Sequence, residues 1–434
     1  MNRIFQFLKK QSPGRLITLG FAFVILLGTF LLLLPISVRP GMEVGFIDAL
    51  FTSTSAVCVT GLIAIDTADH FTAFGRAVVA LLIQVGGLGV TSVGVGFALA
   101  AGKRIGMKGR LLVKESLNVE SSKGMIRLVK AVLLMTVCFE LVGAILSFLV
   151  FMQDYPPLKA VEISIFHSIA AFNNSGFDIL GGLQNLIPYR SDALLNLTTS
   201  GLIIFGGIGF LVIIDVLKNR SFKKLCLHSK VVLTTTAALL LIGTLLLKAT
   251  EDISWLGAFF QSVSARTAGF STYPIGEFSN AGLFTLTMLM FIGASPGSTG
   301  GGIKTSTFFV LIQSVRSLMT KRHQGAFHRS IPAEGTSKAY IIVFLSLLVV
   351  CSGTFFLCIL EPGFSFMQLM FEVTSAFGTV GLSTGITPEL GNLSKLVIVL
   401  IMFIGRLGAF TLASMWVYRP TPSARYTEES IIIG

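Results

Sequence analysis

Phe51-TSTSAVCVT-Gly61-Leu62 is the first of four related stretches in this chain. Each stretch begins at an aromatic residue, continues through small and hydroxyl residues, and reaches a glycine ten positions later that precedes a bulky apolar residue. The other three are Phe166-HSIAAFNNS-Gly176-Phe177, Phe259-FQSVSARTA-Gly269-Phe270 and Phe371-EVTSAFGTV-Gly381-Leu382. The glycines lie roughly 90 to 115 residues apart, and each stretch separates two long apolar runs. This pattern predicts one membrane hairpin repeated four times.

The glycine at the end of each stretch indicates a loop that coordinates a cation with backbone atoms. A dehydrated monovalent cation needs oxygen atoms on all sides, and carbonyls arranged around an axis supply them without fixed charge. Turning consecutive carbonyls toward that axis takes the backbone out of its usual dihedral regions, which glycine tolerates best. The small residues before each glycine suit a short re-entrant helix whose negative dipole end points at the ion. Four such loops predict a single ring around one pore.

The composition indicates a membrane protein with several spans. Hydrophobic residues make up 53% of the 434 residues and charged residues only 12%, which excludes an ordinary soluble domain. We expect spans at residues 16–36, 77–101, 130–152, 195–217, 231–249, 282–316 (broken), 339–360 and 395–417. The predicted fold is an all-α polytopic membrane protein of four tandem helix–pore loop–helix repeats with fourfold pseudosymmetry around a central pore. The repeats are expected at 1–101, 102–217, 218–316 (with a broken inner helix and a gating loop) and 317–434 (with the C-terminal tail).

The distribution of basic residues predicts the orientation of the chain. Most of the Lys and Arg residues lie in segments 1–18, 101–130, 218–230, 316–338 and 417–434. Because cytoplasmic loops carry an excess of basic residues, we expect these segments, and both termini, on the cytoplasmic side. The opposite connections carry most of the carboxylates. The net charge of +12 therefore indicates membrane topology and contact with anionic lipid, and we expect no nucleic-acid partner.

A second glycine motif follows each stretch, in the next apolar helix. The first two copies, Gly86-Gly87-Leu88-Gly89 and Gly206-Gly207-Ile208-Gly209, are small enough for close helix packing. The third copy becomes Gly293-ASPGSTGGGI-Lys304, which has too many glycines, plus Pro296, to stay helical in lipid. Such a segment lines a water-filled path or is buried in protein. In the fourth copy Arg406 replaces a glycine, and a guanidinium within a span needs carbonyls, hydroxyls or an anion around it.

These two departures lead to a gating hypothesis. Loop 294–303 is expected to cross the pore just inside the ring, held there by hydrogen bonds from Arg406 to its carbonyls and hydroxyls. Positive charge at Lys304 and Arg406 would discourage cation passage while the loop is in place. The alternative is a static packing loop with Arg406 as a structural cap. The predicted gate residues are Gly293, Pro296, Gly297, Ser298, Thr299, Gly300, Gly301, Gly302, Lys304 and Arg406.

Together these motifs resemble the Ktr/Trk/HKT superfamily of potassium transporters. The matching features are the four glycine stretches, GSTGGGIK at 297–304 and FIGRLG at 403–408, and they cover essentially the whole chain. The length and the ending resemble the KtrB group, the membrane subunits of bacterial Ktr systems, whereas the GSTGGGIK wording is closer to the Trk group. The resemblance places a K⁺ selectivity filter, formed by backbone carbonyls, at Val59-Thr60-Gly61-Leu62, Asn174-Ser175-Gly176-Phe177, Thr267-Ala268-Gly269-Phe270 and Thr379-Val380-Gly381-Leu382.

The resemblance also implies a function and an assembly. It implies potassium uptake across the bacterial cytoplasmic membrane, with Na⁺ as a stimulating ion. Glycine at position 61, where some sodium-preferring plant relatives have serine, favours potassium. The implied assembly is a homodimer in which each protomer has its own pore, docked on a cytoplasmic ring of KtrA-like regulatory subunits. These partners, and not this chain, would hold the nucleotide. A TrkH-like or less selective K⁺/Na⁺ transporter is the alternative.

Two intramembrane carboxylates and two rival functions complete the sequence-based hypotheses. Glu140 and Glu372 lie at membrane depth, where a structural role, protonated or paired with Arg266 or a backbone donor, competes with a functional one. A coupled transporter for organic solutes would show twofold rather than fourfold similarity. A membrane enzyme would need carboxylates, histidines or a nucleophile grouped at one depth, and the sequence offers no such group. We therefore expect a transporter and no enzymatic activity.

Overall fold

The computed structural model of this chain describes residues 11–100, 107–116, 124–321, 323–409 and 411–412. The predicted C-terminal tail beyond residue 412, the first ten residues and part of the basic segment 101–130 lie outside the described residues. The described part is helical apart from loops and one short antiparallel pair of strands, β1 (Gly325–Ala326) and β2 (Arg329–Ser330). The all-α fold expected from the sequence is confirmed.

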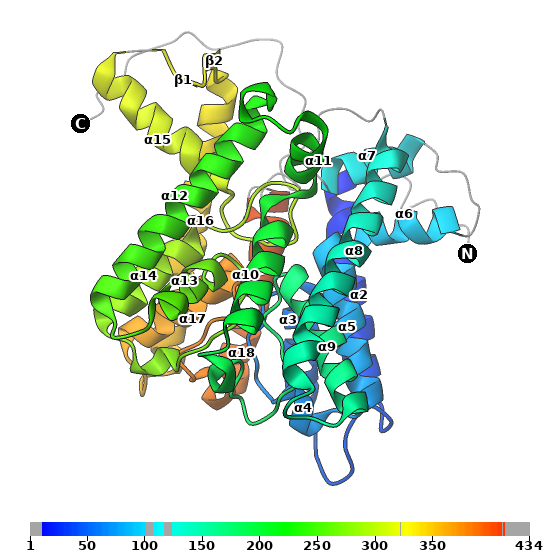
Figure 1. Ribbon diagram of the computed structural model, residues 1–434. Coiled ribbons are helices and arrows are strands. Elements are labelled where there is room, and N and C mark those ends of the chain that lie inside the picture. The colour runs from blue at the N-terminus through cyan, green and yellow to red at the C-terminus, as the bar shows by residue number, and fades with distance from the viewer. Residues whose placement is uncertain (1–10, 101–106, 117–123, 322, 410, 413–434) are drawn as a thin grey trace.

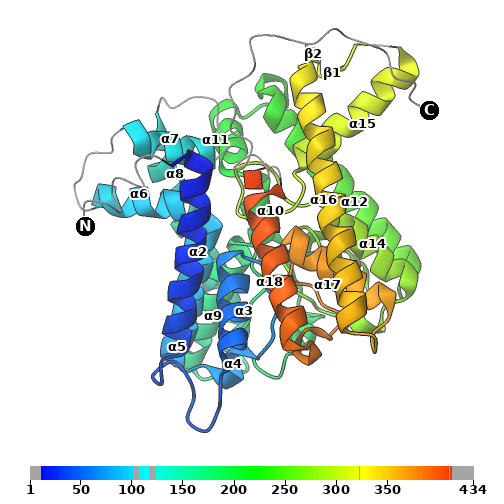
Figure 2. The same cartoon turned by 180° about the vertical axis from the view of Figure 1, so that it is seen from behind.

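Four long helices run along the height of the molecule (Figures 1 and 2). They are α2 (Pro13–Leu32), α8 (Met125–Phe151), α12 (Leu227–Thr250) and α16 (Ala333–Leu360). Within the described residues, these are the single helices long and apolar enough to cross a membrane. Each is the first helix of a helix–loop–helix unit, and all four correspond to predicted spans.

A short helix follows each long one and ends at one of the four glycine stretches. These helices are α3 (Phe46–Val57), α9 (Pro157–Phe172), α13 (Trp255–Ser264) and α17 (Phe366–Gly378). Their C-terminal halves are buried except for the exposed Ile165 and the partly exposed Ile169 of α9, because small and hydroxyl residues let the surrounding helices approach closely. In the third copy the fully buried aromatic ring belongs to Phe260 and not to the predicted Phe259, so its glycine follows after nine residues instead of ten.

Four inner helices then line the centre of the molecule. They are α5 (Ala73–Leu88), α10 (Ala193–Ile208), α14 (Asn280–Phe291) and α18 (Asn392–Leu407). Each inner helix packs on the short helix of the next unit, and the last one closes the circle: α5 on α9, α10 on α13, α14 on α17 and α18 on α3. Figure 2 shows α18 between α3 and α17, where the end of the chain meets its beginning. The fold is therefore that of a multi-pass membrane protein with pore-loop repeats.

The inner helices differ from the continuous spans that the sequence suggested. The prediction of straight spans at 77–101 and 195–217 is wrong: α5 and α6 (Val90–Ala100) meet at 98°, and α10 and α11 (Phe210–Asn219) meet at 96°. The bends lie at Gly89 and Gly209, whose φ values are +81° and +98°. Positive φ values do not occur within a right-handed α-helix, and glycine adopts them most easily. Gly408, with φ of +87°, ends α18 in the same way. The final glycine of the first, second and fourth motifs therefore stops the inner helix, which close packing alone did not predict.

The first glycine of the same motif has the packing role that we expected. A Cβ atom on Gly86, Gly206 or Gly405 would lie 2.0 Å from the carbonyl oxygen of Val57, Phe172 or Phe377, respectively. Each of these oxygens belongs to the end of the short helix in the same unit. The absence of a side chain therefore sets the distance between inner helix and short helix in three of the four units.

This close contact predicts a difference between two glycines of the same helix. Gly206→Ala should lower the melting temperature of the detergent-solubilised protein, because the added methyl group overpacks α10 against Phe172 and costs about 1–3 kcal/mol. Gly201→Ala is the matched control, since a Cβ atom there meets nothing within 4 Å. We expect that control to melt at or above the wild-type temperature. Equal melting of the two variants would contradict the packing role.

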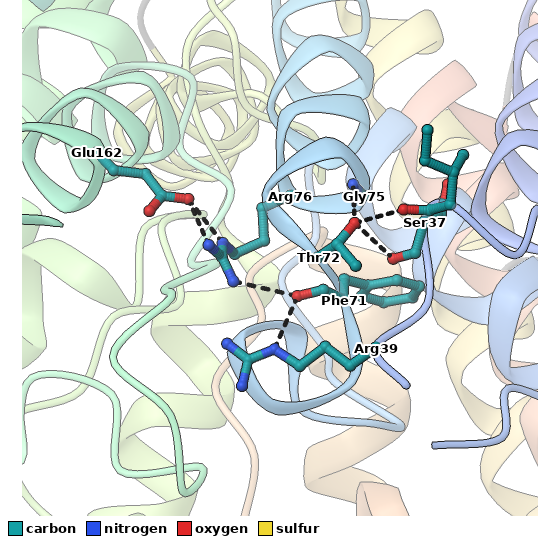
Figure 3. Close-up of polar contacts among 8 residues, drawn as sticks. Ser37, Arg39, Phe71, Thr72, Gly75, Arg76 and Glu162 are labelled. Atoms are coloured by element: carbon teal, nitrogen blue, oxygen red, sulfur yellow. Dashed lines mark hydrogen bonds and ion pairs between the residues drawn. The ribbon is translucent and has the colours of Figure 1, made fainter. Parts of the chain in front are cut away.

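Ion pairs fasten two of the contacts between neighbouring units. Arg76 on α5 binds Glu162 on α9 at 2.7 Å, and Lys395 on α18 binds Asp48 on α3 at 2.8 Å. Arg76 also donates to the carbonyl oxygen of Phe71 at 3.1 Å. Figure 3 shows Arg39 approaching the same oxygen, at 3.3 Å. Both sides of the first unit are thus held at the end of the molecule where α4 (Thr67–His70) lies.

The remaining elements connect these units. They are α7 (Met107–Ser116), α15 (Thr305–Thr320) and the 3₁₀ turns η1 (Ile187–Tyr189), η2 (Phe222–Lys224), η3 (Ile275–Glu277) and η4 (Thr387–Glu389). In Figure 1, α6, α7, α11, α15 and the strands gather at the end of the molecule opposite to α4.

Candidate ion pathway

The four glycine stretches adopt one backbone conformation. Glycines 61, 176, 269 and 381, here called the ring glycines, have φ values of +89°, +69°, +78° and +96°. The residue two positions before each is also left-handed, at Val59 (+57°), Asn174 (+59°), Thr267 (+77°) and Thr379 (+49°). Left-handed backbone at a residue with a Cβ atom is uncommon, and it clusters at functional sites. Four copies of the same pair indicate a constraint common to all four loops.

The ring glycines form a closed circle. A Cβ atom on Gly61 would lie 2.1 Å from the carbonyl oxygen of Ser175, and the next contacts follow in chain order. They join Gly176 to Ala268 (2.7 Å), Gly269 to Val380 (2.2 Å) and Gly381 back to Thr60 (2.2 Å). Each ring glycine thus lies against the carbonyl group of the residue that precedes the next ring glycine. Only residues without side chains allow four backbones to meet this closely around one axis.

Hydrogen bonds to the short helices fix the loops in this conformation. Ser55 accepts from the N–H of Gly61 at 3.0 Å and donates to the carbonyl of Leu62 at 2.8 Å. Ser375 accepts from the N–H of Gly381 at 3.0 Å. Because these donors are N–H groups and hydroxyls of the loop's own unit, they hold the peptide planes without using a charge. The C-terminal, negative ends of the short helices lie next to the ring.

One side of the ring opens into a cavity of about 290 Å³, here called the vestibule. Its floor includes Gly61, Gly269 and Gly381, and its walls carry the polar side chains of Gln184, Asn185, Ser271, Tyr273, Ser383, Thr384 and Thr387. The residues lining it include no Asp, Glu, Lys or Arg. A cation would therefore meet oxygen atoms of neutral groups before it reached the ring.

The loop at residues 292–304, here called the crossing loop, lies on the other side of the ring. A Cβ atom on Gly300 would lie 2.1 Å from the hydroxyl of Thr267, and one on Gly301 would lie 2.3 Å from that of Thr379. Ser295 and Thr299 donate their N–H groups to the carbonyls of Gly207 and Gly206, at 3.0 and 3.2 Å. The loop is therefore packed directly beneath the ring, as the sequence suggested, and it is bound to α10.

Arg406 contacts the crossing loop and the first unit together. Its guanidinium donates to the carbonyl oxygens of Thr299 and Gly86, and to that of Gly87 at 3.2 Å. All three acceptors are carbonyls, so among the described residues Arg406 has none of the hydroxyl partners that we also expected. Lys304 donates to the carbonyls of Gly300 and Gly301, at 2.8 and 3.4 Å. Both cations are thus held by backbone oxygens on the inner side of the ring.

A second arginine at this loop was not predicted as a gate residue. Arg266 is buried, and it donates to the carbonyl of Gly293 at 3.3 Å and to that of Thr236 at 3.4 Å. Its place in the third glycine stretch, SARTAGF, was visible in the sequence. Its contact with the start of the crossing loop joins two loops 27 positions apart in the chain, so the sequence could not reveal it.

The two intramembrane carboxylates have different surroundings. Glu140 accepts from the side chain of Asn173 at 3.0 Å. Glu372 is fully buried and accepts from the backbone N–H of Thr384 at 3.0 Å. Arg266 is hydrogen-bonded to neither of them, so the suggested pairing with that arginine is wrong. The alternative of a backbone donor is confirmed for Glu372.

Comparison with known proteins assigns the chain to a family. The sequence profile of the TrkH family, described as a cation transport protein, matches residues 22–427. The Ktr system potassium uptake protein B of Bacillus subtilis is 40% identical over 98% of this chain and 97% of its own length. The potassium/sodium uptake protein NtpJ of Enterococcus hirae is 39% identical over 98% of each chain. The crystal structure of the potassium transporter TrkH from Vibrio parahaemolyticus has the same fold, with a TM-score of 0.72, 19% identity, and coverage of 94% of this chain and 86% of that one. The chain therefore belongs to the TrkH family of cation transport proteins, together with the Ktr potassium uptake proteins.

Proposed function

We propose that this protein takes up potassium by passive conduction through the ring of four glycine loops. The closed circle of ring glycines carries the proposal, because it brings four sets of backbone carbonyls around one axis, as a dehydrated cation requires. The names of the two similar uptake proteins support potassium as the ion. The selectivity filter consists of residues 59–62, 174–177, 267–270 and 379–382.

The crossing loop is the gate in this proposal. It packs against the filter residues Thr267 and Thr379, and Arg406 and Lys304 add positive charge beside it. Conduction then requires the loop to leave, and release of the Arg406 hydrogen bonds is the first step. In this proposal a cytoplasmic regulatory subunit that binds a nucleotide controls this step. The relative from Bacillus subtilis is named as part of a Ktr system, which supports the existence of a partner subunit.

The position in the cell follows from charge. Lys218, Lys223 and Lys224 lie on α11 and η2, at the end of the molecule opposite to α4. The vestibule lies at the α4 end, because its lining residue Leu183 donates to Asp66, which caps α4. The end with the lysines is cytoplasmic in the proposal, so both termini are cytoplasmic and the vestibule faces outward across the bacterial cytoplasmic membrane. The protein acts as a homodimer and has no enzymatic activity. A less selective K⁺/Na⁺ transporter is the second candidate, supported by the name of the Enterococcus relative, a potassium/sodium uptake protein.

The test is growth of a bacterium that lacks its own potassium uptake systems, at low external potassium. Expression of this chain should restore growth, and a cytoplasmic Ktr regulatory partner should increase the rate. Uptake of ⁸⁶Rb⁺ in the same cells, with Na⁺ as competitor, distinguishes the two candidates. Competition by equimolar Na⁺ would favour the less selective transporter. A chain that reaches the membrane and neither restores growth nor takes up Rb⁺ would contradict the proposal.

A further inference from the structure

One position on the short helices differs in all four units although its surroundings are similar. It directly follows the buried aromatic residue, and it is occupied by Thr52, His167, Gln261 and Glu372. Two residues after the ring glycines, on the vestibule side, stand Ile63, Asp178, Ser271 and Ser383. In the third and fourth units the helix residue is hydrogen-bonded to the residue after the ring glycine, and in the first and second units it is not.

Glu372 forms the stronger of the two connections. Its Oε1 accepts from the hydroxyl of Ser383 at 2.6 Å and from the N–H of Thr384 at 3.0 Å. Its Oε2 accepts from the hydroxyl of Thr387 at 2.8 Å. Ser383, Thr384 and Thr387 all line the vestibule. One fully buried carboxylate therefore holds the chain from two to six residues after Gly381 against α17.

Gln261 forms the corresponding connection in the third unit. Its Nε2 donates to the hydroxyl of Ser271 at 3.0 Å, and Ser271 also lines the vestibule.

The first two units lack such a connection. Ile63 has no polar group for Thr52 to bind, and the hydroxyl of Thr52 has no partner among the described residues. His167 lies 2.9 Å from the hydroxyl of Thr199, while Asp178 accepts from the N–H of Leu180 at 3.0 Å.

We propose that Glu372, assisted by Gln261, is a positioning residue for ion selection: its hydrogen bonds hold the vestibule side of the fourth filter loop, and so fix the carbonyls at Gly381. This inference rests on the proposed filter and deepens it. The two units without the connection have other supports. The first unit is held by the two ion pairs described above. In the second unit, the N–H groups of Leu183 and Gly182 donate to the carboxylates of Asp66 and Asp69, respectively.

The connection depends on hydrogen-bond acceptors, and this makes the proposal testable with a conservative variant. A glutamine at position 372 keeps one carbonyl oxygen for Ser383 and Thr384, and its amide can donate to the hydroxyl of Thr387. Gln261 already makes this type of contact in the third unit. An alanine removes all of these contacts, leaves the buried hydroxyl of Thr384 without its acceptor, and leaves the hydroxyl of Thr387 with the hydroxyl of Ser383 alone.

The experiment compares ⁸⁶Rb⁺ uptake and its inhibition by Na⁺ for four forms of the full-length protein at matched membrane levels. Glu372→Ala should lower the preference for Rb⁺ over Na⁺ by about tenfold and raise the KM for Rb⁺, while Glu372→Gln should stay within about twofold of the wild type. Thr52→Val, at the equivalent and unbonded position of the first unit, should behave as the wild type. If Glu372→Ala does not reach the membrane, Ser383→Ala, which deletes the shortest bond, takes its place with a smaller loss of preference, of about threefold.

Two results would overturn the inference. One is a wild-type preference for Rb⁺ over Na⁺ in both Glu372→Ala and Ser383→Ala. The other is an equal loss of that preference in Glu372→Gln and Glu372→Ala, which would assign the effect to the charge of Glu372 rather than to its hydrogen bonds. The wild-type protein in the same assay separates this failure from failure of the proposed function. A wild type that discriminates between the ions while the variants contradict the inference leaves the filter in place. A wild type without uptake refutes the filter itself.

Discussion

Replacing Gly381 by serine is expected to remove most of the discrimination between potassium and sodium. A Cβ atom at this position would lie 2.2 Å from the carbonyl oxygen of Thr60, and the backbone φ is +96°. Because that oxygen is one of the proposed ion ligands, the loop must move away and enlarge or distort the ring. Selectivity should fall by about tenfold or more, since it depends on the number and placement of the carbonyls. The measurement is inhibition of ⁸⁶Rb⁺ uptake by Na⁺, compared with the wild type.

Gly41→Ser is the matched control for this variant. Gly41 has nearly the same conformation, with φ of +86°, but a Cβ atom there meets nothing within 4 Å. It therefore introduces similar backbone strain far from the ring, and ion preference should not change. Gly61→Ser should act like Gly381→Ser, because its Cβ atom would lie 2.1 Å from the carbonyl of Ser175. Full retention of discrimination in both ring variants would mean that these loops do not form the filter.

Replacing Arg406 by glutamine is expected to increase ion flux. The arginine joins the carbonyl of Thr299 in the crossing loop to those of Gly86 and Gly87 in the first unit. Charge-assisted hydrogen bonds of this kind contribute about 1.5–3 kcal/mol each, so losing even one shifts the loop's equilibrium toward the open state by about tenfold or more. The initial rate of ⁸⁶Rb⁺ uptake without the regulatory partner measures this effect.

A second variant tests the loop itself. Deletion of residues 298–300 removes Thr299 and shortens the segment beneath the ring, and it should raise the same uptake rate. Arg190→Gln controls for the loss of an arginine, because Arg190 is exposed and lies just after η1 on the vestibule side. That control should conduct as the wild type does. A wild-type rate in both Arg406→Gln and the deletion would support the alternative of a static packing loop.

Much of the fold could be predicted because each repeat carries its own signal. The four long helices α2, α8, α12 and α16 follow from uninterrupted apolar runs, which are sufficient in a membrane. The four glycine stretches were recognisable because an inward-facing loop tolerates very few residues other than glycine at its tightest point. The break of the third inner helix could be predicted from Pro296 and the following glycines, since such a segment cannot remain helical.

The errors arose where one residue type has two roles. Glycine permits both close packing and helix termination, and the sequence did not show that Gly89 and Gly209 bend their helices by more than 90°. Similarly, two adjacent phenylalanines in the third stretch left the register open, and burial selected Phe260. In both cases the local sequence allows two conformations, and only contacts with other helices decide between them.

By itself, the sequence determined that the chain is a membrane protein of four related units, each with one glycine loop, because hydropathy and glycine spacing act locally along the chain. Tertiary structure alone showed which backbone groups of the four loops meet, since the contacts from Gly61 to Ser175 and from Gly381 to Thr60 join residues more than a hundred positions apart. It also decided that Glu372 binds the vestibule wall, that Arg266 binds the crossing loop, and which carbonyls accept from Arg406. Those partners depend on how helices from different units pack, a property that no single stretch of sequence contains.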